Sequence, residues 1–553
     1  FRSLGIKTVN ANNPATSIPE LLTATVPVSS ADLIAFQTIL ADAVTAENGA
    51  VTARDVAVAA SIIQYQTFSE LLAISETVDY KQFTVAERAN AAYTLQPSGY
   101  VALAGDATLA NSRVAALQID GEANIRNFGF NPANTSTQNI SAWNLAITRT
   151  KFILIPAGDY NFNDDLLIRG QNTNKFEYFS VRGEGRSSTR LLQQDNSKNT
   201  FVLEKSALND QSNQWLSGSI SSLSIIYSGA QKADDCTALK STSCFNVLFS
   251  DITIEGATKM WSTFGCGHIV YDNIHIENGQ RPVSQGPLEL FKFSNNQNIY
   301  RSSGIYMSNI EQFGAPVADV GFLLEAVDGL YVSNCHFNTC IKKVKISMDN
   351  VELRDVVKQI FFSNVYFDGN TDLQGTALEE VIFIEASNSP QAVVDGLYFS
   401  NVFAREGTTF FAFSPTNTAG LLSVRNIKVG GCHIRGMSSF WFNLGMVDNR
   451  ELNVIRNVSI TGNIFDDAPL ATPTDNLNCI AIAGKNITFT NNTIKGQWVD
   501  GVAAPILVTD AADQVLILGN VLDTNRSGTA GNKSIVISSS ATNVIQANNL
   551  PVE

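Results

Sequence analysis

Three acidic residues hold equivalent places in segments of alternating apolar residues, and their type and spacing suit them for chemistry. The segments FLLE, KISMD and VIFIE end at Glu325, Asp349 and Glu385. Side chains along an extended strand point to opposite faces in turn. The alternation therefore predicts that the three acids point outward in one column, which continues to Ser414 and Asn443 in later segments.

A column of carboxylates matches what glycoside hydrolysis requires. Stacked strands lie about 4.8 Å apart, so like charges on neighbouring strands raise the pKa of at least one carboxyl group. One group then stays protonated as an acid while another stays ionised as a base. Retaining enzymes separate the two carboxyls by about 5–5.5 Å and inverting enzymes by about 6.5–9.5 Å. Glu325 and Glu385, two strands apart, predict the inverting route; nearby alternatives are Asp328, Glu352, Asp355 and Asp395.

A plainer interpretation of the same column is a solvated surface whose acids pair with Lys343, Lys345 or Arg354. A stacked column of acids also resembles a Ca²⁺ site, because hard cations bind several oxygen ligands. No D-x-D-G loop supports that interpretation. We therefore expect no metal ion and no other cofactor.

Aromatic residues near the acids predict a surface for sugar rings. The alternation places Phe383 and Trp441 on the outward face, and Trp261, Tyr271 and Tyr366 would extend it. Large apolar rings supply contact area for a carbohydrate. The competing interpretation is that these are ordinary surface or subunit-interface aromatics.

Two further functions remain open. A lyase would need a base and a cation that neutralises a uronate carboxylate, which Arg281, Lys292 and Arg301 with His268 or Tyr271 would supply. A non-catalytic adhesin would use the aromatic surface without an acid pair. The three functions differ in product, because hydrolysis adds reducing ends, elimination adds an ultraviolet-absorbing double bond, and an adhesin does neither.

The elements that would position these residues repeat along the second half of the chain. Short apolar runs such as GIYMSNI, GLYVSNC, QIFFSNV and GLYFSNV recur at intervals of about 20 to 40 residues. Alternation before a fixed turn indicates strands, and this period indicates a solenoid. We predict an all-β fold, a right-handed parallel β-helix. The shared turn position is Asp251, Asn273, Asn309, Asn334, Asn364, Asn401, Cys432, Asn463, Asn492, Asn520 and Asn549.

Asparagine at this turn has a physical reason. Its short side chain tolerates left-handed backbone angles and bonds neighbouring backbone groups. In a coil, each Asn can also bond the Asn one rung away, so that buried polar groups are satisfied. The apolar residues that follow the turns are expected to stack inside the coil.

Composition excludes several classes of protein. The 553 residues are 44% hydrophobic and 16% charged, which describes a folded protein. A net charge of -14 argues against nucleic acid, and against an acidic polymer unless a local basic groove exists. No apolar run is long enough to insert into a membrane. The seven cysteines are scattered and are expected to pack as small hydrophobic residues, and the four histidines form no catalytic motif.

The N-terminal part has a different pattern. Residues 1–90 predict an arm followed by helices over about 30–48 and 52–75, whose apolar faces suit packing against copies of themselves or attachment to another protein. The alternative is a compact helical cap on the solenoid. Residues 91–140 predict a neck, with a short helix after it near Ile140–Thr148. Residues 141–553 are expected to form the solenoid that binds and cleaves a polysaccharide.

Residues 83–200 carry a family resemblance. The stretch FTVAERANAAYTLQPSGYVALAGDATLANSRVAALQIDGEANIRNFG precedes NFG, AWNLAI, KFILIPAGDYNFNDDLLIRG and VRGEGRSSTRLL. This order resembles the opening of pectate-lyase-type β-helices, and most of all bacteriophage tailspike proteins. There, a capping helix and a PxGxY strand open the coil. After residue 200 only the repeat itself is similar.

The resemblance implies a function and partners. Tailspikes of this kind are homotrimers on the virion tail that bind a bacterial surface polysaccharide outside the cell and commonly cleave it. Attachment to the phage tail or baseplate would use the N-terminal region. Many carry a domain after the β-helix, whereas here the last repeated Asn549 lies close to Glu553. The implied protein is a polysaccharide depolymerase, with Glu325, Asp349 and Glu385 as its expected catalytic residues.

Overall fold

The chain forms two compact units, residues 1–118 and 119–553. This boundary differs from the predicted divisions near residues 90 and 140. The computed structural model describes residues 38, 41–45, 62–170, 177–205, 215–228, 237–277, 289–294, 301–313, 318–338, 340–347, 356–369, 380–385, 393–405, 407–413, 423–437, 440–444, 455–466, 480–496, 505–523 and 534–551. Within these ranges, no helix is long and apolar enough to cross a membrane.

The first unit contains a small sheet in the order β1-β2-β3-β5-β4. Helix α3 (Phe68–Leu72) packs beside it, and Leu71, Phe83 and Tyr93 are fully buried. The predicted helix over 52–75 is therefore wrong in its described part, which contains a strand and α3. Residues 38 and 41–45 are helical, in agreement with the first predicted helix. The strands are β1 (Ile63–Tyr65), β2 (Gln82–Val85), β3 (Ala91–Leu95), β4 (Ala107–Thr108) and β5 (Val114–Leu117).

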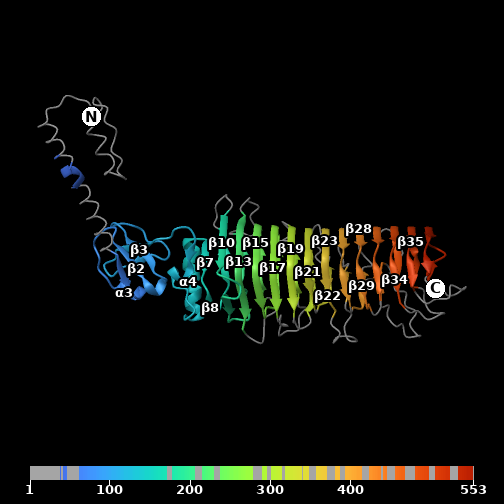
Figure 1. Cartoon of the computed structure of the whole chain (residues 1–553), viewed down its shortest axis with the longest axis horizontal. Coiled ribbons are helices and arrows are strands. Elements are labelled where there is room, and N and C mark those ends of the chain that lie inside the picture. Colours follow the sequence, from blue (N-terminus) through green and yellow to red (C-terminus); the bar gives the residue numbers. More distant parts are fainter. Residues whose placement is uncertain are drawn as a thin grey trace, which may run out of the picture. The chain divides into compact units, whose positions relative to one another are not determined.

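The second unit is the predicted parallel β-helix, in which strands stack along one axis (Figure 1). Every strand pairing within this unit is parallel, and each rung contributes to three faces that we call A, B and C. Six long strands pass from face A to face B. They are β13 (Leu216–Tyr227), β15 (Cys244–Glu255), β17 (Gly267–Glu277), β19 (Ser302–Phe313), β21 (Val327–Phe337) and β23 (Val356–Phe367).

Shorter strands complete faces A and B. Face A also contains β6 (Ala123–Asn124), β7 (Phe152–Ile155), β10 (Glu177–Gly183), β25 (Val393–Ser400), β28 (Ser423–Gly430), β31 (Ile455–Thr461) and β38 (Thr542–Ala547). Face B also contains β8 (Gly158–Phe162), β11 (Thr189–Gln193), β26 (Phe403–Arg405), β29 (His433–Arg435), β32 (Ile464–Asp466), β34 (Thr493–Lys495), β36 (Val521–Asp523) and β39 (Leu550–Pro551).

Face C closes the coil, and β33 (Ile480–Thr490) and β35 (Ile506–Leu518) continue from it into face A. Its other strands are β9 (Leu166–Arg169), β12 (Phe201–Glu204), β14 (Thr237–Thr242), β16 (Lys259–Phe264), β18 (Glu289–Ser294), β20 (Ala318–Leu324), β22 (Cys340–Ser347), β24 (Glu380–Glu385), β27 (Thr409–Phe413), β30 (Phe440–Asn443) and β37 (Ile535–Ile537).

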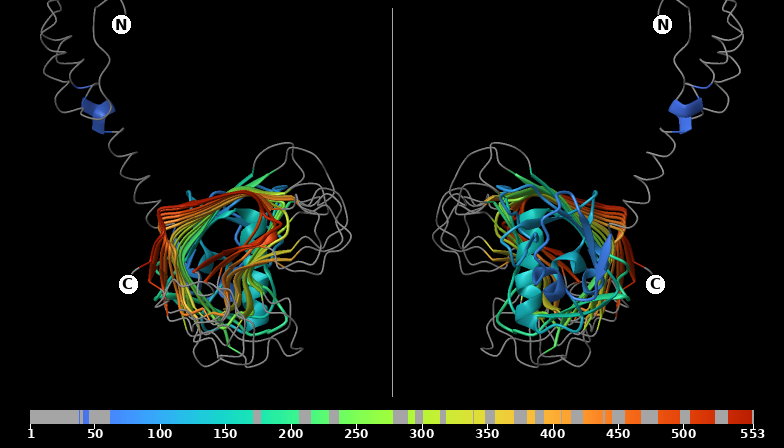
Figure 2. Two further views of the ribbon diagram at one scale, coloured as in Figure 1. Left: turned by 90° about the vertical axis from the view of Figure 1, so that its right-hand side faces the viewer. Right: turned by 90° about the vertical axis from the view of Figure 1, so that its left-hand side faces the viewer.

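Helix α4 (Ser136–Arg149) lies across the first end of the coil, as Figure 2 shows in its right-hand view. Thr135 and Gln138 form a capping box at its start, which satisfies backbone N–H groups that have no partner within the helix. Trp143 is fully buried and donates from Nε1 to the carbonyl oxygen of Leu167, 3.3 Å away. The predicted short helix is confirmed, and it covers apolar rungs that would otherwise face water.

The turn between faces A and B explains the repeated asparagines in two ways. Asn273, Asn309, Asn334, Asn364 and Asn401 have φ between 51° and 55°, the left-handed region that Asn tolerates. From Cys432 onward the left-handed residue stands one position earlier, mostly a glycine such as Gly462 and Gly519. From Cys432 onward the repeated residue therefore points inward. The turn residues that were predicted as one column form two: a left-handed column that ends at Asn401 and an inward column that begins at Cys432.

The inward column becomes a ladder of buried amides. Asn463 donates from Nδ2 to Oδ1 of Asn492 at 2.9 Å, Asn492 to Asn520 at 3.1 Å, and Asn520 to Asn549 at 2.8 Å. Each also donates to a main-chain carbonyl, for example Asn492 to Ile460 at 3.0 Å. This confirms the prediction that stacked asparagines satisfy one another's polar groups.

We predict that Asn492→Ala destabilises the β-helix. The substitution leaves the buried amide groups of Asn463 and Asn520 without their partner, at a cost of about 1–3 kcal/mol for each unsatisfied group. Thermal unfolding followed by circular dichroism should show a lower transition temperature. Thr488→Ala, an outward change in the same region, is the control. Equal unfolding temperatures for the two variants would contradict the stabilising role of the ladder.

Candidate functional site

Face C exposes a strip of paired lysine and glutamate residues. Lys292 Nζ lies 3.2 Å from Glu325 Oε1, and Lys345 Nζ lies 2.5 Å from Glu385 Oε2. Lys342 Nζ lies 2.9 Å from Glu380 Oε2. Each pair joins neighbouring strands, and all six side chains are partly accessible. We call these six residues the Lys–Glu strip.

The parallel register corrects the predicted column of acids. Leu324 pairs with Ile346, and Ser347 pairs with Glu385. Ser347 therefore occupies the position between Glu325 and Glu385 that was predicted for Asp349. The Ser347 hydroxyl donates to Glu385 Oε2 at 3.4 Å. Asp349 itself lies outside the described residues, as do Glu352 and Asp355.

Glu325 and Glu385 lie in one column, as predicted, but each carboxylate has an ammonium group beside it. Both carboxylates are therefore paired with protein cations, and Glu385 has the partner Lys345 that the plainer interpretation of the column expected. The proposal that stacked like charges raise the pKa of at least one carboxyl in the column stays a prediction for this pair.

Glu380 has different surroundings, and the sequence analysis missed it. Only 12% of its side chain is exposed. Burial raises the pKa of Glu380, the nearby charge of Glu385 raises it further, and the ammonium of Lys342 opposes both effects. Glu380 and Glu385 thus lie on one strand in unequal surroundings, with side chains that are 12% and 29% exposed. The available signal was a second Glu at the start of EVIFIE, five positions before Glu385.

Phe383 lies between these carboxyls on β24 and points outward, as predicted. The Lys342 ammonium lies 4.4 Å from the centroid of its ring. A cation over a ring face is attracted by the ring quadrupole, which helps to fix both side chains. The ring is half-buried and forms part of the surface that a ligand on the Lys–Glu strip would contact.

Three other predicted sugar-binding aromatics are not on the surface, whereas Tyr366 is half-buried on face B. Trp261, Tyr271 and Trp441 are fully buried. The Trp261 ring stacks on Tyr271 at 4.3 Å, and Trp441 packs against Phe465 at 5.3 Å. The prediction that these three side chains point outward and bind substrate is therefore wrong.

Their misplacement has one cause on face C. Strict alternation assumes that only every second residue points inward. Here two successive residues are buried in each rung: Met260 with Trp261, Leu290 with Phe291, Val381 with Ile382, Phe410 with Phe411, and Trp441 with Phe442. Tyr271 belongs to face A, where it is inward because its neighbour Val270 takes the outward position.

The groups proposed for a lyase are not brought together. Burial raises the pKa of Tyr271 well above its ordinary value, and its hydroxyl is 2.7 Å from Thr263 Oγ1 inside the coil. Lys292 pairs with Glu325, and the His268 ring contacts Phe245 at 4.9 Å on face A. Arg301 is half-buried, and Arg281 lies outside the described residues.

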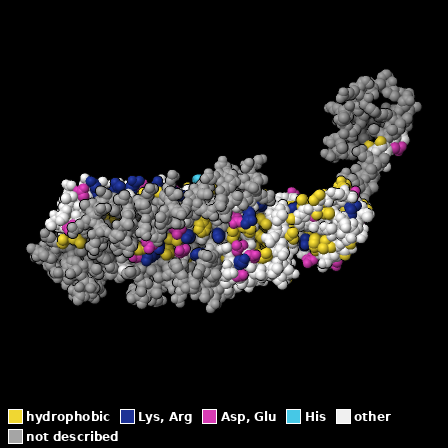
Figure 3. Space-filling view, turned by 180° about the vertical axis from the view of Figure 1, so that it is seen from behind, with side chains coloured by type: hydrophobic (Ala, Val, Ile, Leu, Met, Phe, Trp, Pro, Cys, Tyr) yellow, Lys and Arg dark blue, Asp and Glu magenta, His cyan; other side chains and the backbone are white. Residues whose placement is uncertain are grey.

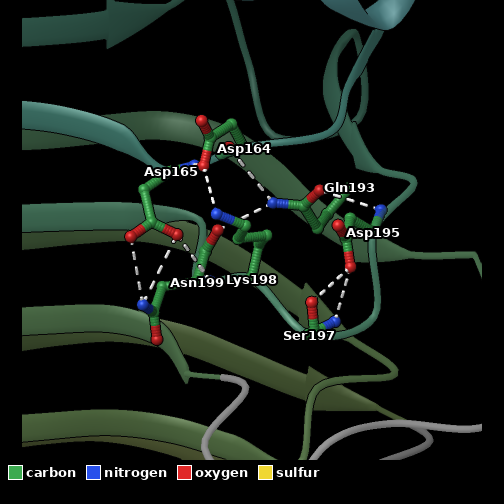
Figure 4. Close-up of polar contacts among 7 residues, drawn as sticks. All are labelled: Asp164, Asp165, Gln193, Asp195, Ser197, Lys198 and Asn199. Carbon is green, nitrogen blue, oxygen red and sulfur yellow. Dashed lines mark hydrogen bonds and ion pairs between the residues drawn. The ribbon is translucent and has the colours of Figure 1, made fainter.

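A dense polar cluster near the first rungs is structural (Figure 4). Lys198 Nζ lies 2.8 Å from Asp164, Ser197 Oγ donates to Asp195 at 2.6 Å, and the Asn199 main-chain N–H donates to Asp165 at 2.9 Å. Lys198 lowers the pKa of Asp164. These acids are occupied by protein donors, and across the described ranges no group of His, Cys, Asp and Glu residues is arranged to hold a metal ion.

The fold also aligns three histidines on face B that the sequence left separate. His275, His336 and His433 share one outward column with Tyr366 and Phe403. His336 lies edge-on to Tyr366 at 4.6 Å, and burial lowers the pKa of His336. Carboxylates flank the outer two, with Glu277 2.5 Å from His275 and Asp466 3.7 Å from His433. These rings stabilise face B by stacking.

The cysteines behave as predicted in the described part of the chain. Cys244, Cys266, Cys335, Cys340 and Cys432 are buried and not disulfide-bonded. Burial raises the pKa of Cys335 to about 12 and that of Cys432 to about 11. Thiols of this kind are not nucleophiles at neutral pH.

Comparison with known proteins gives distant structural similarity. No protein family matches the sequence, and no curated protein matches it. The tailspike protein 3 of bacteriophage CBA120 is 12% identical, with a TM-score of 0.47 over 83% of this chain and 65% of that one. The gp42 tailspike of Acinetobacter phage vb_AbaP_AS12 is 11% identical, with a TM-score of 0.43 over 88% and 75%.

An enzyme is also among the similar structures. The A-module of the mannuronan C-5 epimerase AlgE6 of Azotobacter vinelandii is 12% identical, with a TM-score of 0.44 over 78% of this chain and 100% of that one. Similarities this distant assign no activity. The evidence that this chain forms a parallel β-helix is the parallel pairing of its own strands.

Proposed function

We propose that this protein is a bacteriophage tailspike that binds and depolymerises a bacterial surface polysaccharide by glycoside hydrolysis. The observation that carries the proposal is the pair of unlike carboxyls on β24, Glu380 and Glu385, beside an outward aromatic ring. The sequence resemblance of residues 83–200 to tailspikes supports the biological setting.

Glu380 is proposed as the general acid. Its carboxyl is poorly accessible, and its raised pKa favours the protonated form that can donate to a glycosidic oxygen. The leaving sugar then departs as an alcohol, and Glu380 becomes a carboxylate. The Lys342 ammonium, 2.9 Å away, stabilises that negative charge as it develops.

Glu385 is proposed as the general base. Its side chain is 29% exposed and its carboxylate lies 2.5 Å from the Lys345 ammonium, so an attacking water can reach it and pass it a proton. The charge of Glu385 acts on the Glu380 carboxyl. Inversion, which requires carboxyls about 6.5–9.5 Å apart, remains the proposed route.

The assembly and location follow from the same proposal. The protein would act as a homotrimer on the virion tail, attached to a tail or baseplate protein through its N-terminal region. It would act outside the host cell, on capsule or O-antigen. Glu325, which pairs with Lys292 on the same face, remains proposed as a flanking acid. Asp349, which lies outside the described residues, remains a proposed catalytic residue on the sequence alone.

We predict that Glu380→Gln and Glu385→Gln each lower kcat on the host polysaccharide by about 10²–10⁴-fold, the usual contribution of general acid or base catalysis. The amide keeps the size of the side chain but neither donates the required proton nor acts as a base. Release of reducing ends from purified polysaccharide measures the rate.

Glu255→Gln, on face B, is the matched control and should keep wild-type activity. Wild-type rates in both strip variants would disprove the acid–base assignment. Product that absorbs in the ultraviolet in proportion to chain cleavage would show elimination instead. Binding to the polysaccharide without cleavage by the wild-type protein would show an adhesin.

A second prediction concerns stability and pH. Because burial raises the pKa of folded Glu380 above its ordinary value of 4.5, the folded state binds more protons than the unfolded state above pH 4.5. The contribution of Glu380 to stability is then fully present below pH 4.5 and is lost as pH rises through the folded pKa. The unfolding temperature of the wild-type protein should fall relative to Glu380→Gln across this window.

Thermal unfolding of both proteins from pH 4 to pH 8 measures the difference. A difference that is independent of pH, or one that grows in favour of the wild-type protein, would show that the pKa of Glu380 is not raised.

A further inference from the structure

Face A carries four aromatic rings stacked in one outward column. Tyr306, Tyr331, Phe361 and Tyr398 follow one another in strand register. Their successive ring centroids are 5.0, 4.9 and 4.5 Å apart, and the planes are inclined by only 7° to 11°. Tyr306 is 40% exposed, and the other three rings are half-buried. We call these four residues the aromatic ladder.

Glycines make room for the tyrosine rings. Gly304, Gly329 and Gly396 stand two residues before Tyr306, Tyr331 and Tyr398, each with a positive φ. A Cβ at Gly396 would lie 2.9 Å from the Tyr398 ring, and one at Gly329 would lie 3.3 Å from the Tyr331 ring. The Gly-x-Tyr repeat therefore lets each phenol lie back across its own strand.

The ladder leads into a basic patch. Tyr398 pairs with Lys428, which is exposed on the next rung. Three positions earlier on the strands, Arg425, Arg456 and Lys485 succeed one another in register. Figure 3 shows Lys and Arg side chains gathered along one edge of the solenoid toward its C-terminal end. We call Arg425, Lys428, Arg456 and Lys485 the basic patch.

Arg456 and Lys428 are the two members of the patch with no ion pair in the described part of the chain. Arg425 pairs with Asp395 at 2.9 Å and Lys485 with Asp513 at 3.5 Å. In the described part of the chain no ion pair involves Arg456, and its buried Nε has no hydrogen-bond partner. Like charges on adjacent strands destabilise a sheet. An anion at Arg456 would offset that repulsion and use the guanidinium fork for two parallel hydrogen bonds.

We propose that face A is a binding track for an acidic polysaccharide, with sugar rings on the aromatic ladder and a carboxylate of the polymer at Arg456. This inference rests on the proposed function, and it names the substrate class. The overall charge of -14 opposes an acidic polymer in general, and the basic patch supplies the local exception. The track lies on a different face from the Lys–Glu strip, so binding and cleavage are separable.

Charge complementarity selects this occupant over others. A second copy of the same face would bring another set of cations to Arg456, whereas a uronate supplies the missing anion. The exposed edges of the stacked rings offer apolar contact area to a polymer that runs along the coil.

The test measures binding in the Glu380→Gln background, so that no cleavage interferes. Probes are oligosaccharides of polygalacturonate, alginate, hyaluronan and polysialic acid, with methyl-esterified oligogalacturonate and dextran as neutral comparisons. Isothermal titration calorimetry gives the affinity. We expect at least one acidic probe to bind more tightly than every neutral probe, with an affinity that falls as salt is added.

Two variants test the residues. Arg456→Gln should weaken binding of that acidic probe at least tenfold, and Phe361→Ala should weaken it by breaking the ladder. Arg190→Gln, on face B, is the matched control and should bind as the parent protein does. Unfolding temperatures without ligand verify that each variant is folded.

Several results would overturn the track. They are failure of all four acidic probes to bind, equal affinity for esterified and free oligogalacturonate, or unchanged affinity in Arg456→Gln. If the wild-type protein binds an acidic probe but does not hydrolyse polysaccharide, the binding track stands and the proposed hydrolysis is wrong. If the wild-type protein hydrolyses polysaccharide and Arg456→Gln leaves binding unchanged, the proposed function stands and the binding track is wrong.

Discussion

The parallel hydrogen-bond register between successive rungs is the constraint on which the rest of the molecule depends. It places residues about thirty positions apart in the chain side by side, within one strand spacing. A residue type that recurs once per rung therefore forms a continuous column of side chains along the coil. The Lys–Glu strip, the aromatic ladder and the buried amides all arise in this way. None of them exists as a local sequence motif.

The three faces use the same register for different chemistry. Face C pairs opposite charges across rungs, which holds carboxylates in fixed and unequal surroundings. Face A stacks aromatic rings and then cations, which suits a long and charged ligand. Face B stacks histidines with aromatics and serves the stability of the coil. A solenoid can thus divide recognition and catalysis between faces without a second domain.

The sequence predicted the fold well because the repeat is dense and its turns have a strict backbone requirement. Asn309, Asn334 and Asn364 reveal the rung boundaries directly, since left-handed angles exclude most residues. The capping helix followed from its position before a PxGxY strand.

The site was harder to predict for two physical reasons. Insertions of different length between strands hide the register, so Asp349 was placed where Ser347 lies. Strict alternation also fails where two successive residues point inward. For this reason Trp441 was predicted to point outward, although it is fully buried. The Gly-x-Tyr pattern was visible, but it signals a ladder only after the rungs are aligned.

The buried amides have a consequence for how such a chain assembles. Rungs built from Ile, Val and Leu are nearly interchangeable, so a growing coil can misthread by pairing with the wrong predecessor at little cost. From Asn463 onward, a misthreaded rung would set an amide against an alkyl group and forfeit its hydrogen bonds. The hydrogen-bonded asparagines in the last rungs therefore favour the correct register of each rung over a misthreaded one.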